Sequence, residues 1–248
     1  MPEFSEPGHS LMRELSQWWQ DRRSRSGFFA SLASLAKECW QFLRDSTPAR
    51  RRQRYGDVDY DWDQRVDTTS ATISWRARFI GHFHSPYQPT DPALFHEMLQ
   101  GLLINFPDFT FIDLGSGKGR VLLLAADYPF RRILGVELLS ELERVAQENL
   151  RNYASSSQKC FSVESVCADA RRFSFPAEPT VLYLFNPLPE SGLRQVMANL
   201  DQSMREHPRP VYVLYHNPLL VPVVAQCAPL KKIGGSHQYS VFTNHPAS

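Results

Sequence analysis

Long apolar runs are missing from the 248-residue sequence: none reaches about 18 consecutive residues, the length that a membrane-spanning helix needs. The first residues include Glu3 and Glu6 and form no apolar stretch, so no secretory signal is expected. Hydrophobic residues make up 42% of the chain, which excludes disorder for most of it. We therefore expect a folded cytoplasmic protein, either one large domain or a domain of about 100–200 residues with an extension.

Cysteine is also scarce, and its spacing is uninformative. No two cysteines have Cys-x-x-Cys spacing, and no Cys/His cluster is typical of a zinc site. A chain of this length can build a core without disulfides, so we expect reduced thiols and no metal site. The four cysteines are Cys39, Cys160, Cys167 and Cys227.

Neither sign of charge is in excess. Lys plus Arg total 27 and Asp plus Glu total 26, a net charge of +1, which disfavours a globally basic nucleic-acid binder. The charges are nevertheless clustered, because an arginine run at 50–54 precedes aspartates that alternate with apolar residues at 57–63. The two runs either neutralise each other locally or are solvated. An arginine cluster can bind phosphate, but the adjacent carboxylates oppose this, so nucleic acid is a less expected partner.

The first 104 residues have helical patterns. Residues 1–9 contain two prolines and a glycine, which predicts a mobile tail. Apolar and aromatic residues at three- and four-residue spacing over 10–43 predict two helices separated at Gly27. These aromatics either pack on the main domain or form a surface for a protein partner or a membrane.

Asp91-Pro92 predicts another helix start. Its apolar set is Leu94, Phe95, Met98, Leu99, Leu102 and Leu103. We expect residues 10–104 to form a helical extension or lid.

From residue 109 onward, short apolar runs alternate with amphipathic stretches. This alternation predicts an α/β fold with a parallel sheet covered by helices on both faces. The predicted strands are 109–114, 132–137, 161–167, 180–185 and 210–215, followed by an antiparallel pair at 230–233 and 238–243. The predicted helices are 120–127, 140–153, 190–204 and 219–227.

Three alternate glycines follow the first of these strands, in Asp113-Leu114-Gly115-Ser116-Gly117-Lys118-Gly119-Arg120. Such a loop lets the backbone approach a ligand closely. A dinucleotide fingerprint would need Gly or Ala where Arg120 stands. A phosphate-binding P-loop would need Ser or Thr after Lys118, where Gly119 stands. Neither spacing fits.

The pattern D-x-G-x-G-x-G resembles motif I of the class I S-adenosylmethionine-dependent methyltransferases, and the resemblance covers residues 105–248. It implies a Rossmann-like, seven-stranded, mostly parallel methyltransferase sheet with an antiparallel last strand, and S-adenosyl-L-methionine as cofactor. It also implies that the ribose hydroxyls are bound by Glu137 and the adenine edge by Asp169 with Ala170. The loop residues implied to lie at the aminoacyl part are Asp113, Gly115, Ser116, Gly117 and Gly119.

Two further segments are candidate parts of the site. Tyr87 and Thr90 stand in a Tyr-x-Pro-Thr segment that resembles one covering the methionine end of the cofactor in certain protein-lysine methyltransferases; an ordinary turn is the alternative. Asn186-Pro187 partly resembles the Asn-Pro-Pro-aromatic tetrad of amino methyltransferases, although Leu188 and Pro189 replace its last two residues. The resemblance implies that Asn186 contacts both the cofactor and the acceptor.

A second Asn-Pro step ends the fifth strand, in His216-Asn217-Pro218. His216 is a candidate for acceptor positioning or for a base, since its ordinary pKa is about 6.5. Asn217 is expected to cap the following helix. Weaker histidine candidates are His82, His84 and His237.

The sequence therefore predicts methyl transfer to a small molecule or a protein side chain, achieved mainly by positioning acceptor and methyl group. A general base is needed only if the acceptor holds a proton near working pH. One alternative is a non-catalytic methyltransferase-fold module that binds a protein partner through its aromatic N-terminal helices. Another is a nucleotide-binding protein with a nearby fold.

Overall fold

The computed structural model describes Ser16, Gln20, Arg23 and residues 58–69, 89–186 and 188–245. Residues 57–68 and 89–248 form one compact unit. The other unit, residues 1–56 and 69–88, is described at four positions, and Ser16, Gln20 and Arg23 among them are helical and exposed. The predicted tail at 1–9 and the rest of the predicted helices at 10–43 lie outside the described residues.

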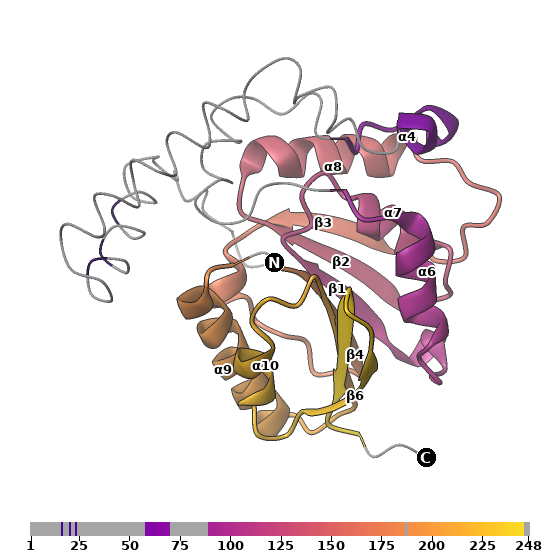
Figure 1. Cartoon of the computed structure of the whole chain (residues 1–248). Helices are drawn as coiled ribbons and strands as arrows, with labels where there is room; N and C mark the ends of the chain where they lie inside the picture. Colours follow the sequence, from indigo (N-terminus) through magenta and orange to yellow (C-terminus); the bar gives the residue numbers. More distant parts are fainter. Residues whose placement is uncertain are drawn as a thin grey trace. The chain divides into compact units, whose positions relative to one another are not determined.

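A seven-stranded sheet with the order β3-β2-β1-β4-β5-β7-β6 forms the centre of the larger unit (Figure 1). The first five strands run parallel, and β7 runs antiparallel to both β5 and β6. The strands are β1 (Thr110–Leu114), β2 (Arg132–Glu137), β3 (Val163–Cys167), β4 (Thr180–Phe185), β5 (Val211–His216), β6 (Lys231–Gly235) and β7 (Tyr239–Thr243). The predicted α/β class and the antiparallel closing pair are both confirmed.

Helices cover both faces of the sheet (Figure 1). One core joins α6 and α7 to one face, and a second core joins α9 and α10 to the other. Alternate residues of the central strands, such as Phe111 and Ile112 of β1, enter opposite cores, so the strands are apolar on both sides. The helices are α4 (Val58–Gln64), α6 (Pro92–Gln100), α7 (Arg120–Ala126), α8 (Ser140–Asn152), α9 (Glu190–Glu206) and α10 (Val221–Ala225), with 3₁₀ turns η1 (Phe106–Asp108) and η2 (Ala170–Arg172).

Some element boundaries differ from the prediction for identifiable reasons. Helix α6 ends at Gln100, so Leu103 lies beyond it and is 98% exposed, whereas it was expected on the apolar face. Strand β3 begins at Val163 rather than at Phe161, which is exposed and not part of the core. Helix α10 begins at Val221, since Asn217 has a positive φ of 46° and starts a turn instead.

Two classes of feature are missing from the described part of the chain. None of its helices is both long enough and apolar enough to span a membrane. Within the same residues, no cluster of three or more His, Cys, Asp or Glu side chains is arranged to hold a metal ion.

Candidate functional site

The glycine loop leaves β1 at the carboxyl edge of the sheet, where ligands bind in open parallel sheets. Gly115, Gly117 and Gly119 have φ angles of 84°, 55° and 83°, which residues with a Cβ atom rarely adopt. The Gly115 and Ser116 amides both donate to the Val136 carbonyl of β2, at 2.8 and 3.2 Å. The alternate glycines of the motif are therefore required by the path of the backbone.

The loop also packs closely against β2. A Cβ built on Gly135 would lie 2.6 Å from Leu122 Cδ1 and 2.8 Å from Ser116 Oγ. The Ser116 hydroxyl is buried and has no hydrogen-bond partner among the described residues. Ser116 therefore turns its side chain toward Gly135 of β2.

Two buried carboxylates lie beside the loop. Glu137, the last residue of β2, accepts from the Gly117 amide through Oε2 and from the Leu139 amide through Oε1, each at 2.8 Å. Asp113 is 2% exposed, and its burial together with the neighbouring charge of Glu137 raises its pKa well above the ordinary value. Perturbed carboxyl groups of this kind mark functional sites.

This donor and acceptor set fits the cofactor implied by the sequence. A phosphate would be repelled by the charge of Glu137, whereas ribose hydroxyls would donate to it. A carboxylate offers about four lone-pair positions, so Glu137 can hold the loop and still accept from hydroxyl groups. The three positive-φ glycines lack the Cβ atoms that would otherwise project from the loop.

Asp169 follows β3 and caps η2, accepting from the Arg171 amide at 2.9 Å. It also forms an ion pair with Arg171 Nη2 at 2.7 Å. Burial acts to raise the pKa of Asp169, but the hydrogen bonds and charge of Arg171 outweigh it, so the pKa is lowered. Asp169 is therefore a fixed carboxylate with Ala170 next to it, as a role at the adenine edge would need. That role stays a prediction.

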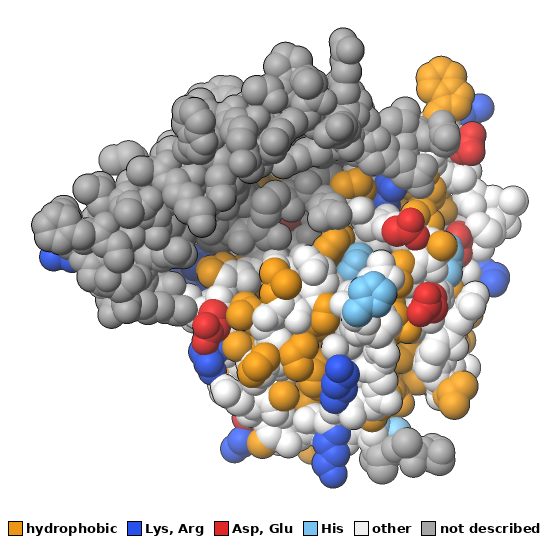
Figure 2. All heavy atoms as spheres, in the orientation of Figure 1, with side chains coloured by type: hydrophobic (Ala, Val, Ile, Leu, Met, Phe, Trp, Pro, Cys, Tyr) orange, Lys and Arg blue, Asp and Glu red, His pale blue; other side chains and the backbone are white. Residues whose placement is uncertain are grey.

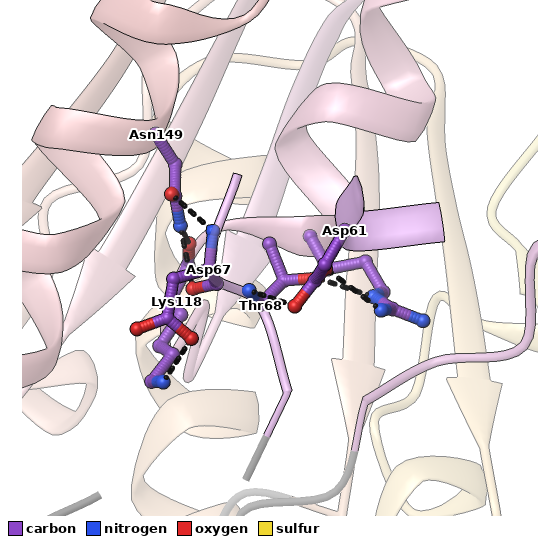
Figure 3. Close-up of polar contacts among 6 residues, drawn as sticks. Asp61, Asp67, Thr68, Lys118 and Asn149 are labelled. Carbon is purple, nitrogen blue, oxygen red and sulfur yellow. Dashed lines mark hydrogen bonds and ion pairs between the residues drawn. The ribbon is translucent and has the colours of Figure 1, made fainter. Parts of the chain in front are cut away.

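Two cations of the glycine motif bind residues 58–68: Lys118 points away from the loop toward Asp67 (Figure 3), and Arg120 bonds to Asp61. They are 1% and 3% exposed. Lys118 Nζ forms an ion pair with Asp67 at 2.8 Å. Arg120 Nη2 pairs with Asp61 at 3.0 Å. Motif I alone did not predict these pairs, because the partners come from far upstream in the sequence.

Arg120 is held on several sides. Its Nε donates to Thr68 Oγ1 at 2.6 Å, and its guanidinium carbon lies 4.7 Å from the centre of the Tyr60 ring. Asp61 also accepts from the Thr68 amide at 2.7 Å and from the Thr68 hydroxyl. Asp61, one of the aspartates at 57–63, is therefore part of a buried hydrogen-bonded network. This network includes Arg120, the first residue of the helix that follows the loop.

A hydrogen-bonded chain leads along the rim from Thr90 to His216. Thr90 Oγ1 lies 3.0 Å from the Tyr183 hydroxyl, which lies 2.7 Å from His216 Nδ1. Phe185 stacks on the His216 ring at 3.8 Å between centroids. Burial lowers the pKa of His216 to about 4, against a smaller opposing effect of Asp91. His216 is therefore neutral at neutral pH and would be a weak base.

Both Asn-Pro steps have an asparagine in the left-handed region, with φ of 46°. Asn186 Oδ1 accepts from the Tyr215 hydroxyl at 3.0 Å, which fixes its amide. Asn217 is exposed, and the expectation that it caps the next helix is wrong, because Leu220 is the N-cap of α10 and no side chain caps it.

The remaining candidates are not brought to this rim by any described contact. His237 is exposed in the turn between β6 and β7. Tyr87, His82 and His84 lie outside the described residues. On the face shown in Figure 2, lysine and arginine side chains of the described residues are dispersed and form no continuous basic patch.

A family model described as "Histone methylation protein DOT1" matches residues 66–185. No curated protein sequence matches the chain. The matched residues run from Val66, shortly after α4, to Phe185 at the end of β4. They include the glycine loop, Glu137 and Asp169.

Solved structures that are similar to the chain include three proteins with different acceptors in their names. One is an RNA methyltransferase from Salinibacter ruber with S-adenosyl-L-homocysteine, at 21% identity over 62% of this chain and 91% of that one, with a TM-score of 0.44. Another is a ribosomal protein L11 methylase from Lactobacillus delbrueckii subsp. bulgaricus, at 15% identity over 61% and 74%, with a TM-score of 0.41. The third is the glycopeptide N-methyltransferase MtfA with S-adenosyl-L-methionine, at 11% identity over 64% and 88%, with a TM-score of 0.47.

Proposed function

Because the chain belongs to the class I S-adenosylmethionine-dependent methyltransferases, we propose that its acceptor is a protein side chain or a small molecule, the protein side chain first. The observation that carries the proposal is the match to the family model described as "Histone methylation protein DOT1", which spans the loop and its carboxylates. The net charge of +1 and the dispersed cations in Figure 2 support this choice over nucleic acid.

The proposed cofactor site consists of the glycine loop and the residues at the ends of the next strands. The bound cofactor supplies a methyl group on a sulfonium, which is a good leaving group. The chain's task is to hold the two reactants in line. Glu137 and Asp169 are proposed to bind the ribose hydroxyls and the adenine edge. The other proposed contacts are Asp113, Gly115, Ser116, Gly117, Gly119, Ala170, Asn186, Tyr87 and Thr90.

On the acceptor side, Asn186 and His216 are proposed to position the reacting group. The fixed Asn186 amide can orient an acceptor that donates hydrogen bonds. His216 is neutral and stacked on Phe185, so it serves as a fixed polar group rather than as a proton acceptor. An amine acceptor would then have to reach the site already deprotonated. Burial among aromatic groups favours this because it lowers the pKa of an amine.

We also propose that different parts of the chain have different roles, and we call this assignment the division of the chain. Residues 105–248 bind the cofactor, residues 10–104 contribute to acceptor binding as an extension or lid, and residues 1–9 form a tail. Two parts of residues 10–104 are exceptions to this division: the segment 58–68, which contacts the glycine loop, and Tyr87 with Thr90, which are proposed cofactor contacts.

The test is a methyl-transfer assay with tritiated S-adenosyl-L-methionine and a fractionated cell lysate. Label is expected in protein, or failing that in small molecules, and its position identifies the acceptor class. Glu137→Gln is expected to reduce label incorporation by about tenfold or more, since it removes the charge that accepts hydroxyl donors. Glu164→Gln, at an exposed position of β3, is the matched control and should retain the activity.

Two results would contradict the proposal. Label that enters only nucleic acid would refute the acceptor class. Equal activity of Glu137→Gln and the wild type would remove Glu137 from the cofactor site.

A further inference from the structure

The upstream segment, residues 58–68, is joined to the glycine loop directly by the Asp67 side chain and indirectly, through Asn149 of α8, by its backbone. Asn149 of α8 joins the two: its Nδ2 donates to the carbonyls of Lys118 and Asp67, both at 2.9 Å. The Asp67 amide donates back to Asn149 Oδ1 at 2.8 Å. The backbone of Lys118, between two positive-φ glycines, is therefore fixed to the same amide group that fixes Asp67.

The side chain of Lys118 reinforces this link. Its ammonium group ends at Asp67 Oδ1, 51 residues earlier in the sequence, and only 1% of the side chain is exposed (Figure 3). Burying an ammonium group is costly unless a carboxylate neutralises it, so the ion pair with Asp67 favours the loop conformation that buries Lys118. The Asp67 side chain itself is 41% exposed, so a substitution there leaves the protein core intact.

The rest of the loop is fixed from other directions. The Gly117 amide is bound by Glu137, and the helix after Gly119 is bound through Arg120 by Asp61 and Thr68. The lysine between Gly117 and Gly119 is thus the point at which the upstream segment can set the shape of the loop.

We propose that Asp67 is a positioning residue for cofactor binding: by neutralising buried Lys118 it holds the glycine loop in the conformation that accepts the cofactor. The proposal rests on the proposed function, because it takes the glycine loop as the cofactor loop. It adds that cofactor affinity depends on a carboxylate outside motif I and about 50 residues upstream of it.

The test compares Asp67→Asn with Asp63→Asn, an exposed aspartate of the same segment, in the full-length chain. Calorimetric titration with S-adenosyl-L-homocysteine, well below the unfolding temperature, is expected to give a Kd about tenfold higher for Asp67→Asn, the effect of losing one charge-assisted hydrogen bond. Asp63→Asn should bind like the wild type. Amide hydrogen exchange without ligand should be faster at residues 115–120 in Asp67→Asn only, and unchanged in β4.

A second pair of variants separates positioning from a general loss of stability. Lys118→Met removes the cation that Asp67 neutralises, so Asp67→Asn added to Lys118→Met is expected to change the Kd by less than twofold. A tenfold effect of Asp67→Asn in both backgrounds would overturn the proposal. So would an Asp67→Asn protein that unfolds at lower temperature but binds and exchanges like the wild type.

The proposed function can fail without deciding this inference. If the wild type gives no binding heat, the proposed cofactor site is refuted, and the exchange experiment alone decides whether Asp67 sets the loop. Faster exchange at residues 115–120 supports that part, and unchanged exchange overturns it.

Discussion

Gly135 shows at the scale of one residue how a missing side chain shapes the site. It lies in β2 beneath the loop, where Leu122 and Ser116 already occupy the space that a Cβ would take. The backbone at this position needs no unusual φ, so the requirement for glycine is one of space alone.

Gly135→Ala is therefore expected to lower the free energy of unfolding by about 1–3 kcal/mol, the usual cost of adding a methyl group to a filled core. Urea denaturation measures the change. Gly234→Ala is the matched control, because nothing lies within 4 Å of its Cβ position, and its effect should stay within about 0.5 kcal/mol. Similar losses for both variants would mean that the close packing under the loop is not what selects glycine.

The residues of motif I show what sequence can and cannot predict at this scale. The positions of Asp113, Glu137 and Asp169 followed from local pattern, because each lies at or near the carboxyl end of a predicted strand. The partners of Lys118 and Arg120 did not, since ion pairs across 51 and 59 residues leave no periodic signal in the sequence. The low pKa of His216 also depends on burial between Phe185 and Tyr183, which only the folded chain provides.

At the scale of an element, α6 connects the Thr90 end of the rim to the core. Asp91 caps it by accepting from the Leu94 amide at 3.0 Å, and Pro92 occupies the first turn. Leu94, Phe95 and Met98 bury the face that packs on β1 and α7. The start of this helix was predicted correctly from Asp-Pro; its end was not, because Gly101 ends it before Leu103.

Asp91→Ala is expected to cost about 1 kcal/mol of unfolding free energy, the usual effect of losing an N-cap. Thermal unfolding monitored by circular dichroism at 222 nm reports it. Asp91→Asn keeps an oxygen for the Leu94 amide and should remain close to the wild type. If the two variants are equally destabilised, the cap itself is not the cause.

At the scale of the whole molecule, one residue of the proposed cofactor site, Asp113, reduces stability. Burial and the charge of Glu137 raise the pKa of Asp113 above its ordinary 3.8. The native state therefore holds a proton at pH values where the unfolded chain has lost it, and stability falls as pH rises from 3.8 through the raised pKa. Residues that a site requires commonly lower the stability of the folded protein in this way.

Asp113→Asn is accordingly expected to be more stable than the wild type at pH 7 without ligand, with a difference that shrinks toward pH 4. Urea unfolding at several pH values measures this difference. Binding of S-adenosyl-L-homocysteine should weaken in the same variant. A variant that is less stable at pH 7, or a gain that does not depend on pH, would contradict the assigned cause.

The sheet as a whole was more predictable than the docking of its upstream segment. The pattern of strands and helices predicted a parallel sheet with an antiparallel closing pair, and β1–β7 confirm both. Nothing in the local pattern of residues 58–68 indicated that this segment would lie against α7 and α8, because its anchors are single polar side chains.

The buried pairs of Lys118 and Arg120 have a practical consequence for anyone who shortens this protein. A fragment that begins at residue 105 would retain every glycine of the motif and all seven strands, yet it would lack both Asp61 and Asp67. Two cations would then be left in the interior without these carboxylates. The smallest piece suited to expression on its own therefore begins before residue 58, although the recognisable motif begins at 113.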